Sequence, residues 1–243
     1  MSRGGSLNRT ARTLERVRRK CERFRRSNAL NFYESRPFSS GLVEAAKAGK
    51  GLGRRSRWGK TLPALVFVVD PARTPDGGLA IAARLPRGTG VIYRSFGAPN
   101  APQIAAALTR IARQRGLILL IGADEALAAR CGAHGLHLPE RMTAAAPRIR
   151  ARRPGWLITT AAHCPRALAR AARAGCDAAL FSTVFESRSA SAGRPIGPVR
   201  FAALSRGAKL PVYALGGVNA RTAMRLLSSG AAGLAAVEGV AEA

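Results

Sequence analysis

The chain has 243 residues, of which 47% are hydrophobic and only 5% aromatic, so its core must be built mainly from Ala, Leu, Val and Ile. It contains no run of about 18 apolar residues and no apolar secretory segment, so we expect neither a membrane span nor a secretory signal. The four cysteines are scattered and form no Cys-x-x-Cys pair, which indicates free thiols and favours a cytoplasmic protein.

The net charge of +27 is unevenly distributed along the chain. Residues 1–60 contain 17 Lys and Arg against 4 Glu, whereas residues 61–243 contain 23 against 9 over three times the length. A basic surface attracts phosphorylated small molecules, nucleic acids and anionic membranes alike. Charge alone therefore predicts an anionic partner without choosing its class.

Residues 1–60 are predicted to form a basic extension, largely disordered or partly helical, in front of a domain over residues 61–243. Within the extension, Thr10 to Arg26 has a narrow apolar stripe typical of one helix, and Gly49 to Lys60 is predicted to be a disordered linker. Three interpretations stay open. The extension is solvated, or it makes a non-specific contact with an anion such as nucleic acid or a membrane, or its helix docks on the domain.

From Thr61 onward, short apolar runs alternate with segments of helical spacing. Pro102, Pro147, Pro165 and Pro198 stand near the expected helix starts, where a missing N–H costs little. Eight such alternations predict an α/β fold of the (β/α)8 TIM-barrel type, with an open doubly wound sheet as the alternative. The expected strands are Ala64–Asp70, Gly90–Arg94, Gly116–Ile121, Gly135–Leu138, Trp156–Thr160, Ala178–Ser182, Pro211–Leu215 and Gly233–Val237.

The predicted domain is small for a barrel, because the sequence stops at Ala243 just after the eighth strand. We therefore expect a truncated eighth helix. One hypothesis is that the helix predicted at Thr10 to Arg26 covers the position that the eighth helix leaves open.

A Gly-Gly pair follows the seventh expected strand, and Asn219 behind it can cap the next helix. A turn of this kind lets backbone N–H groups approach a phosphate, although a plain tight turn is the simpler interpretation. In a TIM barrel, phosphate commonly binds at the loops after strands seven and eight. Gly216, Gly217, Val237 and Glu238 stand at those two loops and are the predicted phosphate-binding residues.

Six segments of the domain, read in order, resemble the thiamin-phosphate synthase and thiazole tautomerase (TenI-like) family of small (β/α)8 barrels. They occur in the family's order and at its spacing. The resemblance covers residues from about Leu65 to Val240. The segments are Gly135 to Glu140, Ile158 to His163, Ala174 to Asp177, Thr183 to Ser187, Ala214 to Val218 and Gly230 to Val237.

The family's synthases join a pyrimidine diphosphate to a thiazole phosphate with Mg²⁺, which requires carboxylates for the metal and cations for the diphosphate. Of the cationic pattern that the family carries after strand two, this sequence keeps Arg94 alone. The expected metal-binding acids are displaced, and Asp124 and Glu140 are the nearest candidates. The resemblance therefore implies Mg²⁺ only if synthase activity is retained.

The tautomerase branch of the family uses a His after strand five as the acid/base that moves a proton on a thiazole phosphate carboxylate. His163 stands at that position, and a near-neutral imidazole suits proton transfer. Arg94, at a strand end, is expected to meet an anion. Ser187 and Ser189 are candidates for an anion-binding lid, with a solvated loop as the alternative.

Three functions follow from these residues. The first is a thiamin-biosynthesis enzyme, either coupling a thiazole phosphate to the pyrimidine diphosphate or isomerising the thiazole phosphate. The second is a non-catalytic binder of thiazole or thiamin phosphate, and the third is a nucleic-acid-associated protein that acts through its basic tail. A metal site at Cys131, His134 and His137 is disfavoured, because Gly135 interrupts any helix there. The oligomeric state stays open, an oligomer included.

Overall fold

The structure is a computed structural model that describes residues 40–48, 55–70, 73–74, 76–187, 189 and 192–237. The chain divides into two compact units, Met1–Pro37 and Phe38–Ala243, and the second is the unit described below. The unit that holds the barrel therefore begins well before Thr61, the expected start of the domain. The helix predicted at residues 10–26, and with it the expected cover for the eighth helix, lies outside the described residues.

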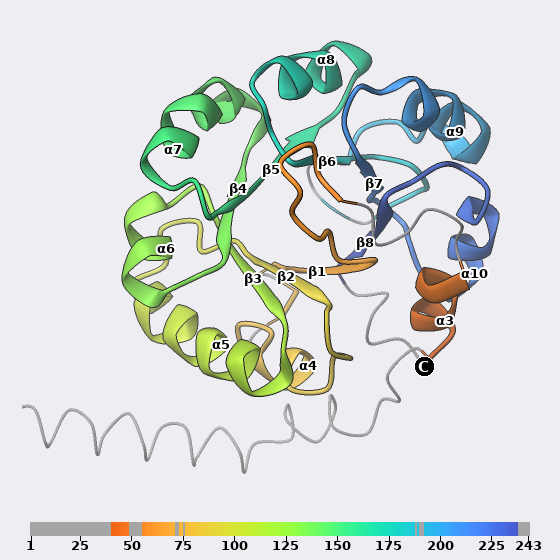
Figure 1. Cartoon of the computed structure of the whole chain (residues 1–243). Coiled ribbons are helices and arrows are strands. Elements are labelled where there is room, and N and C mark those ends of the chain that lie inside the picture. Colours follow the sequence, from red (N-terminus) through yellow and green to blue (C-terminus); the bar gives the residue numbers. More distant parts are fainter. Residues whose placement is uncertain are drawn as a thin grey trace, which may run out of the picture. The chain divides into compact units, whose positions relative to one another are not determined.

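Eight parallel strands form a closed barrel in the order of the chain, as the alternation of apolar runs predicts (Figure 1). The barrel closes where the first strand pairs with the last, with Leu65 opposite Leu234. This closure excludes the open doubly wound sheet. The strands are β1 (Leu65–Val69), β2 (Gly90–Tyr93), β3 (Ile118–Gly122), β4 (Gly135–Leu138), β5 (Leu157–Ala162), β6 (Ala178–Phe181), β7 (Val212–Ala214) and β8 (Gly233–Ala236).

Helices follow the strands and surround the barrel in Figure 1. Proline occupies one of the first two positions of α5, α7, α8 and α9, as expected for the residues that mark their starts. The helices are α3 (Ser40–Ala48), α4 (Leu79–Ala82), α5 (Ala101–Arg115), α6 (Glu125–Cys131), α7 (Ala146–Arg152), α8 (Pro165–Arg173), α9 (Gly197–Gly207) and α10 (Ala220–Ala223), with 3-10 turns at Glu140–Ala145 and Met224–Leu226. No helix among the described residues is long and apolar enough to cross a bilayer.

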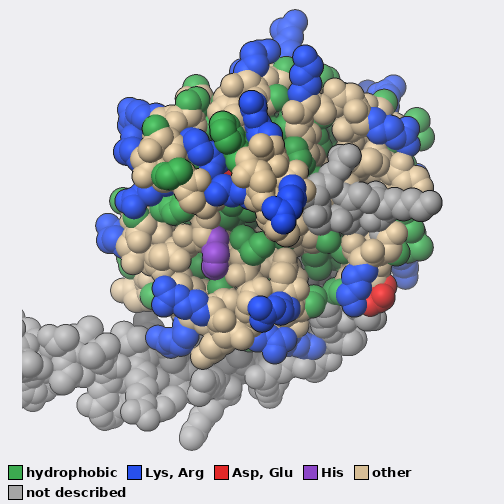
Figure 2. All heavy atoms as spheres, viewed as in Figure 1, with side chains coloured by type: hydrophobic (Ala, Val, Ile, Leu, Met, Phe, Trp, Pro, Cys, Tyr) green, Lys and Arg blue, Asp and Glu red, His purple; other side chains and the backbone are tan. Residues whose placement is uncertain are grey.

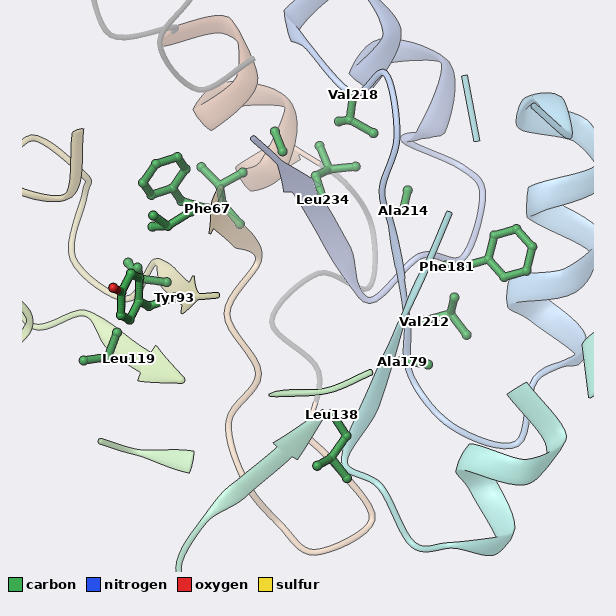
Figure 3. Close-up of a cluster of buried hydrophobic side chains, with 14 of the residues drawn as sticks. Phe67, Tyr93, Leu119, Leu138, Ala179, Phe181, Val212, Ala214, Val218 and Leu234 are labelled. Atoms are coloured by element: carbon green, nitrogen blue, oxygen red, sulfur yellow. The ribbon is translucent and has the colours of Figure 1, made fainter. Parts of the chain in front are cut away.

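Side chains alternate between two cores along the strands, because successive strand residues point to opposite faces. The larger core lies between the barrel and its helices, and Figure 3 shows part of it. The smaller core fills the inside of the barrel and includes Val68, Ile92 and Leu180. Aromatic residues are few, so both cores depend on aliphatic side chains, as the composition predicts.

Helix α3 lies beside α10 on the outer wall of the barrel (Figure 1). It buries Leu42, Val43, Ala45 and Ala46, whose spacing places them on one stripe of the helix. These residues belong to the same core as Phe67 of β1 and other strand residues. A helix that precedes the barrel in sequence therefore covers part of its wall.

The segment before β1 is ordered where the structure describes it, so the prediction of a disordered linker is wrong for residues 55–60. Arg55 pairs with Thr61 in an isolated antiparallel bridge, and the N–H of Ser56 donates to the carbonyl of Lys60. The Trp58 indole donates to the carbonyl of Gly175, and the Lys60 ammonium donates to two carbonyls of the loop before β5. These long-range bonds fix a segment whose composition alone indicates disorder.

The Arg150–Asp177 ion pair stabilises the end of the barrel where β5 and β6 begin. Asp177 is fully buried and also accepts the N–H of Ile158. Arg150 donates to the carbonyl of Trp156, and its guanidinium lies 5.5 Å from the centre of the Trp58 ring. The segment before β1 therefore packs onto this ion pair and covers it.

Candidate active site

A cavity of about 880 Å³ opens at the carboxyl ends of the barrel strands. Residues that follow each of the eight strands line it, so every strand contributes to its wall. This is the end of a TIM barrel at which ligands bind. Figure 2 shows that Lys and Arg side chains far outnumber acidic ones on the face of the molecule drawn there, which favours an anionic ligand.

Arg94 extends from the end of β2 into this cavity. Its Nη2 atom is 2.8 Å from Oδ2 of Asp70, which follows β1. The Arg94 Nε atom is buried and has no hydrogen-bond partner among the described residues. Burial lowers the pKa of Arg94, and the neighbouring Arg73 lowers it further while Asp70 opposes both. Arg94 is therefore a partly desolvated cation that Asp70 holds at the cavity wall.

Phe96 follows on the same loop and is 74% exposed, although it is a large apolar side chain. Its φ of 46° lies in the left-handed region that bulky residues rarely adopt. The Arg94 guanidinium lies 5.2 Å from the centre of its ring. The aromatic ring thus borders the cavity beside the cation.

His163 lies one residue beyond β5, on the cavity wall. Its Nδ1 atom is 3.1 Å from both the carbonyl oxygen and the hydroxyl oxygen of Ser182. A carbonyl oxygen can only accept, so the bond to it requires a proton on Nδ1 and leaves the lone pair of the neutral ring on Nε2. The side chain does not cap α8, whose N-cap is Cys164 with no side-chain bond.

The two acidic candidates for a metal have other partners. Asp124 caps α6, its Oδ1 accepting the N–H of Leu127 at 2.8 Å. Glu140 accepts the N–H of His163 at 3.0 Å with one oxygen and pairs with Arg170 at 2.5 Å with the other. No group of three His, Cys, Asp or Glu side chains comes together among the described residues. One oxygen of Asp124 and both oxygens of Glu140 are thus engaged by the protein itself.

Gly216 and Gly217 form a tight turn after β7 and border the cavity. Both have positive φ values, 92° and 64°, and a Cβ on Gly217 would lie 2.2 Å from the carbonyl oxygen of Glu186. The pair is therefore required by close packing against the loop after β6. Among the described residues, no acceptor takes the N–H of Gly216, Gly217 or Val218, so these donors are available to a ligand.

Three of the remaining predicted site residues belong to this cavity. Ser187, Ser189 and Val237 line the same cavity, and the N–H of Ser189 donates to the Ser187 hydroxyl. Asn219 caps α10 as expected, accepting N–H groups from Arg221 and Thr222. Glu238 lies outside the described residues.

His137 is a cavity residue that sequence reasoning placed in a strand but not in the site. It lies in β4, is buried, and contacts the Thr159 hydroxyl across the strand pair at 2.9 Å. Asp70 is a second missed residue. A signal for both exists in the pattern, because a polar residue inside an otherwise apolar strand or at its carboxyl end faces the mouth of a barrel.

A closed (β/α)8 barrel with a cavity at the carboxyl ends of its strands defines the class of TIM-barrel proteins, whose ligands bind at that end. The chain belongs to the TMP-TENI family, described as thiamine monophosphate synthase, whose sequence model matches residues 65–240. It is thus a member of a family of thiamin-biosynthesis enzymes, as the resemblance of its segments implies.

Individual relatives agree with this assignment. The chain is 33% identical over 189 residues to a thiamine-phosphate synthase from Alcanivorax borkumensis. The match covers 72% of this chain and 84% of the relative. It is 30% identical over 142 residues to a thiamine-phosphate synthase from Chlorobium luteolum. That match covers 58% of this chain and 67% of the relative. The match to a Geobacter sulfurreducens relative spans 65% of that protein, so the chain spans about two thirds of its length.

Among solved structures, the chain resembles thiamine phosphate pyrophosphorylase from Pyrococcus furiosus. The TM-score is 0.64 at 22% sequence identity, and the match covers 74% of this chain and 87% of that chain. At this identity the likeness establishes the barrel fold alone.

Proposed function

We propose that this protein isomerises a thiazole phosphate carboxylate by moving one proton, with His163 as the acid/base. The observation that carries the proposal is the bond from His163 Nδ1 to the Ser182 carbonyl. It orients the ring and leaves the lone pair on Nε2, so that this atom can take a proton from carbon and return it elsewhere on the ring. The isomerisation conserves atoms and charge and needs no co-reactant.

The anionic parts of such a substrate match the donors at the cavity rim. The free N–H groups after β7 and the loop after β6, with Ser187 and Ser189, suit the phosphate. Arg94 suits the carboxylate, since its guanidinium lines the cavity and Asp70 holds it in place. Binding both ends of the substrate fixes the ring carbon beside His163.

The second candidate is coupling of the thiazole phosphate to a pyrimidine diphosphate, which the names of the curated relatives favour. That reaction needs metal-binding acids, and Asp124 and Glu140 are engaged as a helix cap and in an ion pair. A non-catalytic binder would keep the anion donors and have no use for an oriented imidazole. We therefore place isomerisation first.

The proposal includes a phosphorylated small molecule as the partner and a cytoplasmic location. The 17 Lys and Arg of residues 1–60 favour an additional, non-specific contact with anions. Salt-dependent binding of a polynucleotide by the full chain, weakened by Gln at the arginines of residues 9–26, would support that contact. Binding that is equally strong after these substitutions would contradict it.

The direct test follows the two tautomers of the thiazole phosphate carboxylate by NMR with the full chain, in the absence of added metal. We expect the wild-type protein to interconvert them and His163→Ala to be slower by about 10²- to 10⁴-fold. His134→Gln is the matched control, because its imidazole lies outside the cavity and accepts the N–H of Leu119. It should leave the rate unchanged.

Two results would contradict isomerisation. In the first, His163→Ala interconverts the tautomers as fast as the wild type. In the second, the wild type leaves them unchanged but releases pyrophosphate from the pyrimidine diphosphate when Mg²⁺ is supplied, which would establish coupling in place of isomerisation.

A further inference from the structure

His137 and Thr159 occupy facing positions of β4 and β5 in the parallel register of the barrel. Their neighbours Leu136, Leu138 and Ile158 belong to the outer core, so the alternation of side chains directs His137 and Thr159 into the barrel. Several cavity-lining residues lie within strands, and we define these as the cavity floor. Among the described residues they are Val68, Gly122, His137, Ala161, Leu180 and Ala236.

His137 is the polar side chain of this floor, since the other members that the structure describes are aliphatic or glycine. It is only 7% exposed, and its Nδ1 atom is held 2.9 Å from the Thr159 hydroxyl. Among the described residues, Nε2 has no partner, and the ring borders the cavity. Nε2 is not among the fully buried atoms that lack a partner, so it is open to the cavity, where it can donate to or accept from a ligand atom.

The charge of His137 separates its role from that of Arg94. Burial, and then the nearby Arg94 guanidinium, lower the pKa of His137 to about 3. The imidazole is therefore neutral at physiological pH and contributes no net charge to the attraction of phosphate or carboxylate. It can donate or accept one hydrogen bond, according to the tautomer that the Thr159 hydroxyl stabilises.

We propose that His137 binds the uncharged nitrogen of a flat heterocyclic substrate on the cavity floor and so selects nitrogen heterocycles among phosphorylated ligands. The inference rests on the proposed function, because the anionic groups of that substrate are bound at the rim by Arg94 and by the turn after β7. With both anions at the rim, the ring reaches the aliphatic floor, where His137 offers a neutral hydrogen-bonding atom.

Thr159 is a positioning residue in this proposal. Its hydroxyl fixes the orientation of the imidazole from the neighbouring strand and does not border the cavity. Thr159→Val removes the hydroxyl and keeps the branched shape, whereas Thr159→Ser keeps the hydroxyl. The pair separates the hydrogen bond from the packing of the side chain.

The test measures binding of two probes to the full chain by titration calorimetry. The probes are the thiazole phosphate carboxylate and its thiophene analogue, in which C–H replaces the ring nitrogen. We expect the wild type to prefer the thiazole by about tenfold, the typical effect of one neutral hydrogen bond. In His137→Phe this preference should disappear, in Thr159→Val it should fall to about threefold, and in Thr159→Ser it should be retained.

Inorganic phosphate is the control probe. Its affinity should be the same in the wild type and in all three variants, which also shows that they are folded. Equal binding of the two heterocycles by the wild type, or a preference that survives in His137→Phe, would overturn the role of His137. If His137→Phe does not fold, the Thr159 pair decides, and equal preference in Thr159→Val and the wild type overturns the proposal.

Failure of this inference is distinct from failure of the proposed function. The His163→Ala rate tests isomerisation and does not depend on the thiazole preference. Loss of the preference with intact dependence on His163 would overturn the inference alone. A wild type that binds neither heterocycle would overturn both.

Discussion

The two ends of the barrel each contain an arginine–aspartate pair, and the two pairs have different surroundings. At the end where β5 and β6 begin, Asp177 is fully buried, accepts a backbone N–H as well as Arg150, and is covered by the segment of Trp58. At the cavity, the side chains of Arg94 and Asp70 are 27% and 16% exposed, and Arg94 lines the cavity wall.

The comparison separates stability from function within one fold. A buried ion pair that also bonds to the backbone holds neighbouring β-strands together. Removing one partner leaves the other as a buried charge without a counter-charge. A pair at the cavity holds a cation in place where a ligand can reach it. We therefore expect substitutions at the first end to change unfolding and those at the second to change binding.

Asp177→Asn should produce the largest change in stability. It leaves the Arg150 guanidinium in a buried site without a counter-charge, which typically costs about 3–5 kcal/mol. Urea unfolding of the full chain measures this loss, and the affinity for inorganic phosphate should be unchanged. A loss below about 1 kcal/mol would contradict the role given to this pair.

Leu42→Ala tests whether α3 is part of the barrel wall. Leu42 is fully buried against the outer core, so removing its side chain should cost about 2–4 kcal/mol of unfolding free energy. Glu44→Gln is the control on the same helix, because the exposed Glu44–Lys47 pair contributes less than about 1 kcal/mol. Equal stability of Leu42→Ala and Glu44→Gln would show that α3 is dispensable.

His137 should make the protein less stable in mild acid. Its pKa is lowered from 6.5 to about 3 in the folded state, so the unfolded chain takes up the proton first and stability falls as the pH drops below 6.5. Between pH 7 and pH 5 this effect amounts to at most about 2 kcal/mol. Urea unfolding at both values should show a smaller loss for His137→Gln than for the wild type, and an identical loss would contradict a neutral, buried His137.

Asp70→Asn is the counterpart of Asp177→Asn at the cavity. It should have the smallest effect on stability, about 1 kcal/mol or less, because the Asp70–Arg94 pair is partly exposed. Arg94 would lose the partner that positions it, so the affinity for a carboxylate-bearing ligand should fall about tenfold. Thermal unfolding and titration with the thiazole phosphate carboxylate measure the two effects. A destabilisation as large as that of Asp177→Asn would remove the contrast between the ends.

The strands were predictable from sequence because each is a short apolar run bounded by glycine, proline or polar residues. Each of the eight expected runs overlaps one strand, and no end is shifted by more than two residues. Helix α3 and the ordered segment of residues 55–60 were not predictable in this way. They are stabilised by contacts with residues far along the chain, such as the bond from Trp58 to Gly175, which local composition does not encode.

The site was predictable in position more than in chemistry. Arg94, His163 and the Gly216–Gly217 turn follow strands and line one cavity, as expected from their places in a barrel. The partners of Asp124 and Glu140 depend on three-dimensional contacts that no spacing reveals. The pairing of His137 with Thr159 depends on the strand register.

The central claim is that His163 moves a proton on a phosphorylated thiazole. The most direct measurement is the exchange of deuterium from heavy water into the thiazole phosphate carboxylate, followed by NMR, with the wild type, His163→Ala and His134→Gln. We expect exchange with the wild type and His134→Gln and a loss of at least about a hundredfold with His163→Ala. Exchange that is equally fast in His163→Ala, or absent with the wild type, would contradict the account.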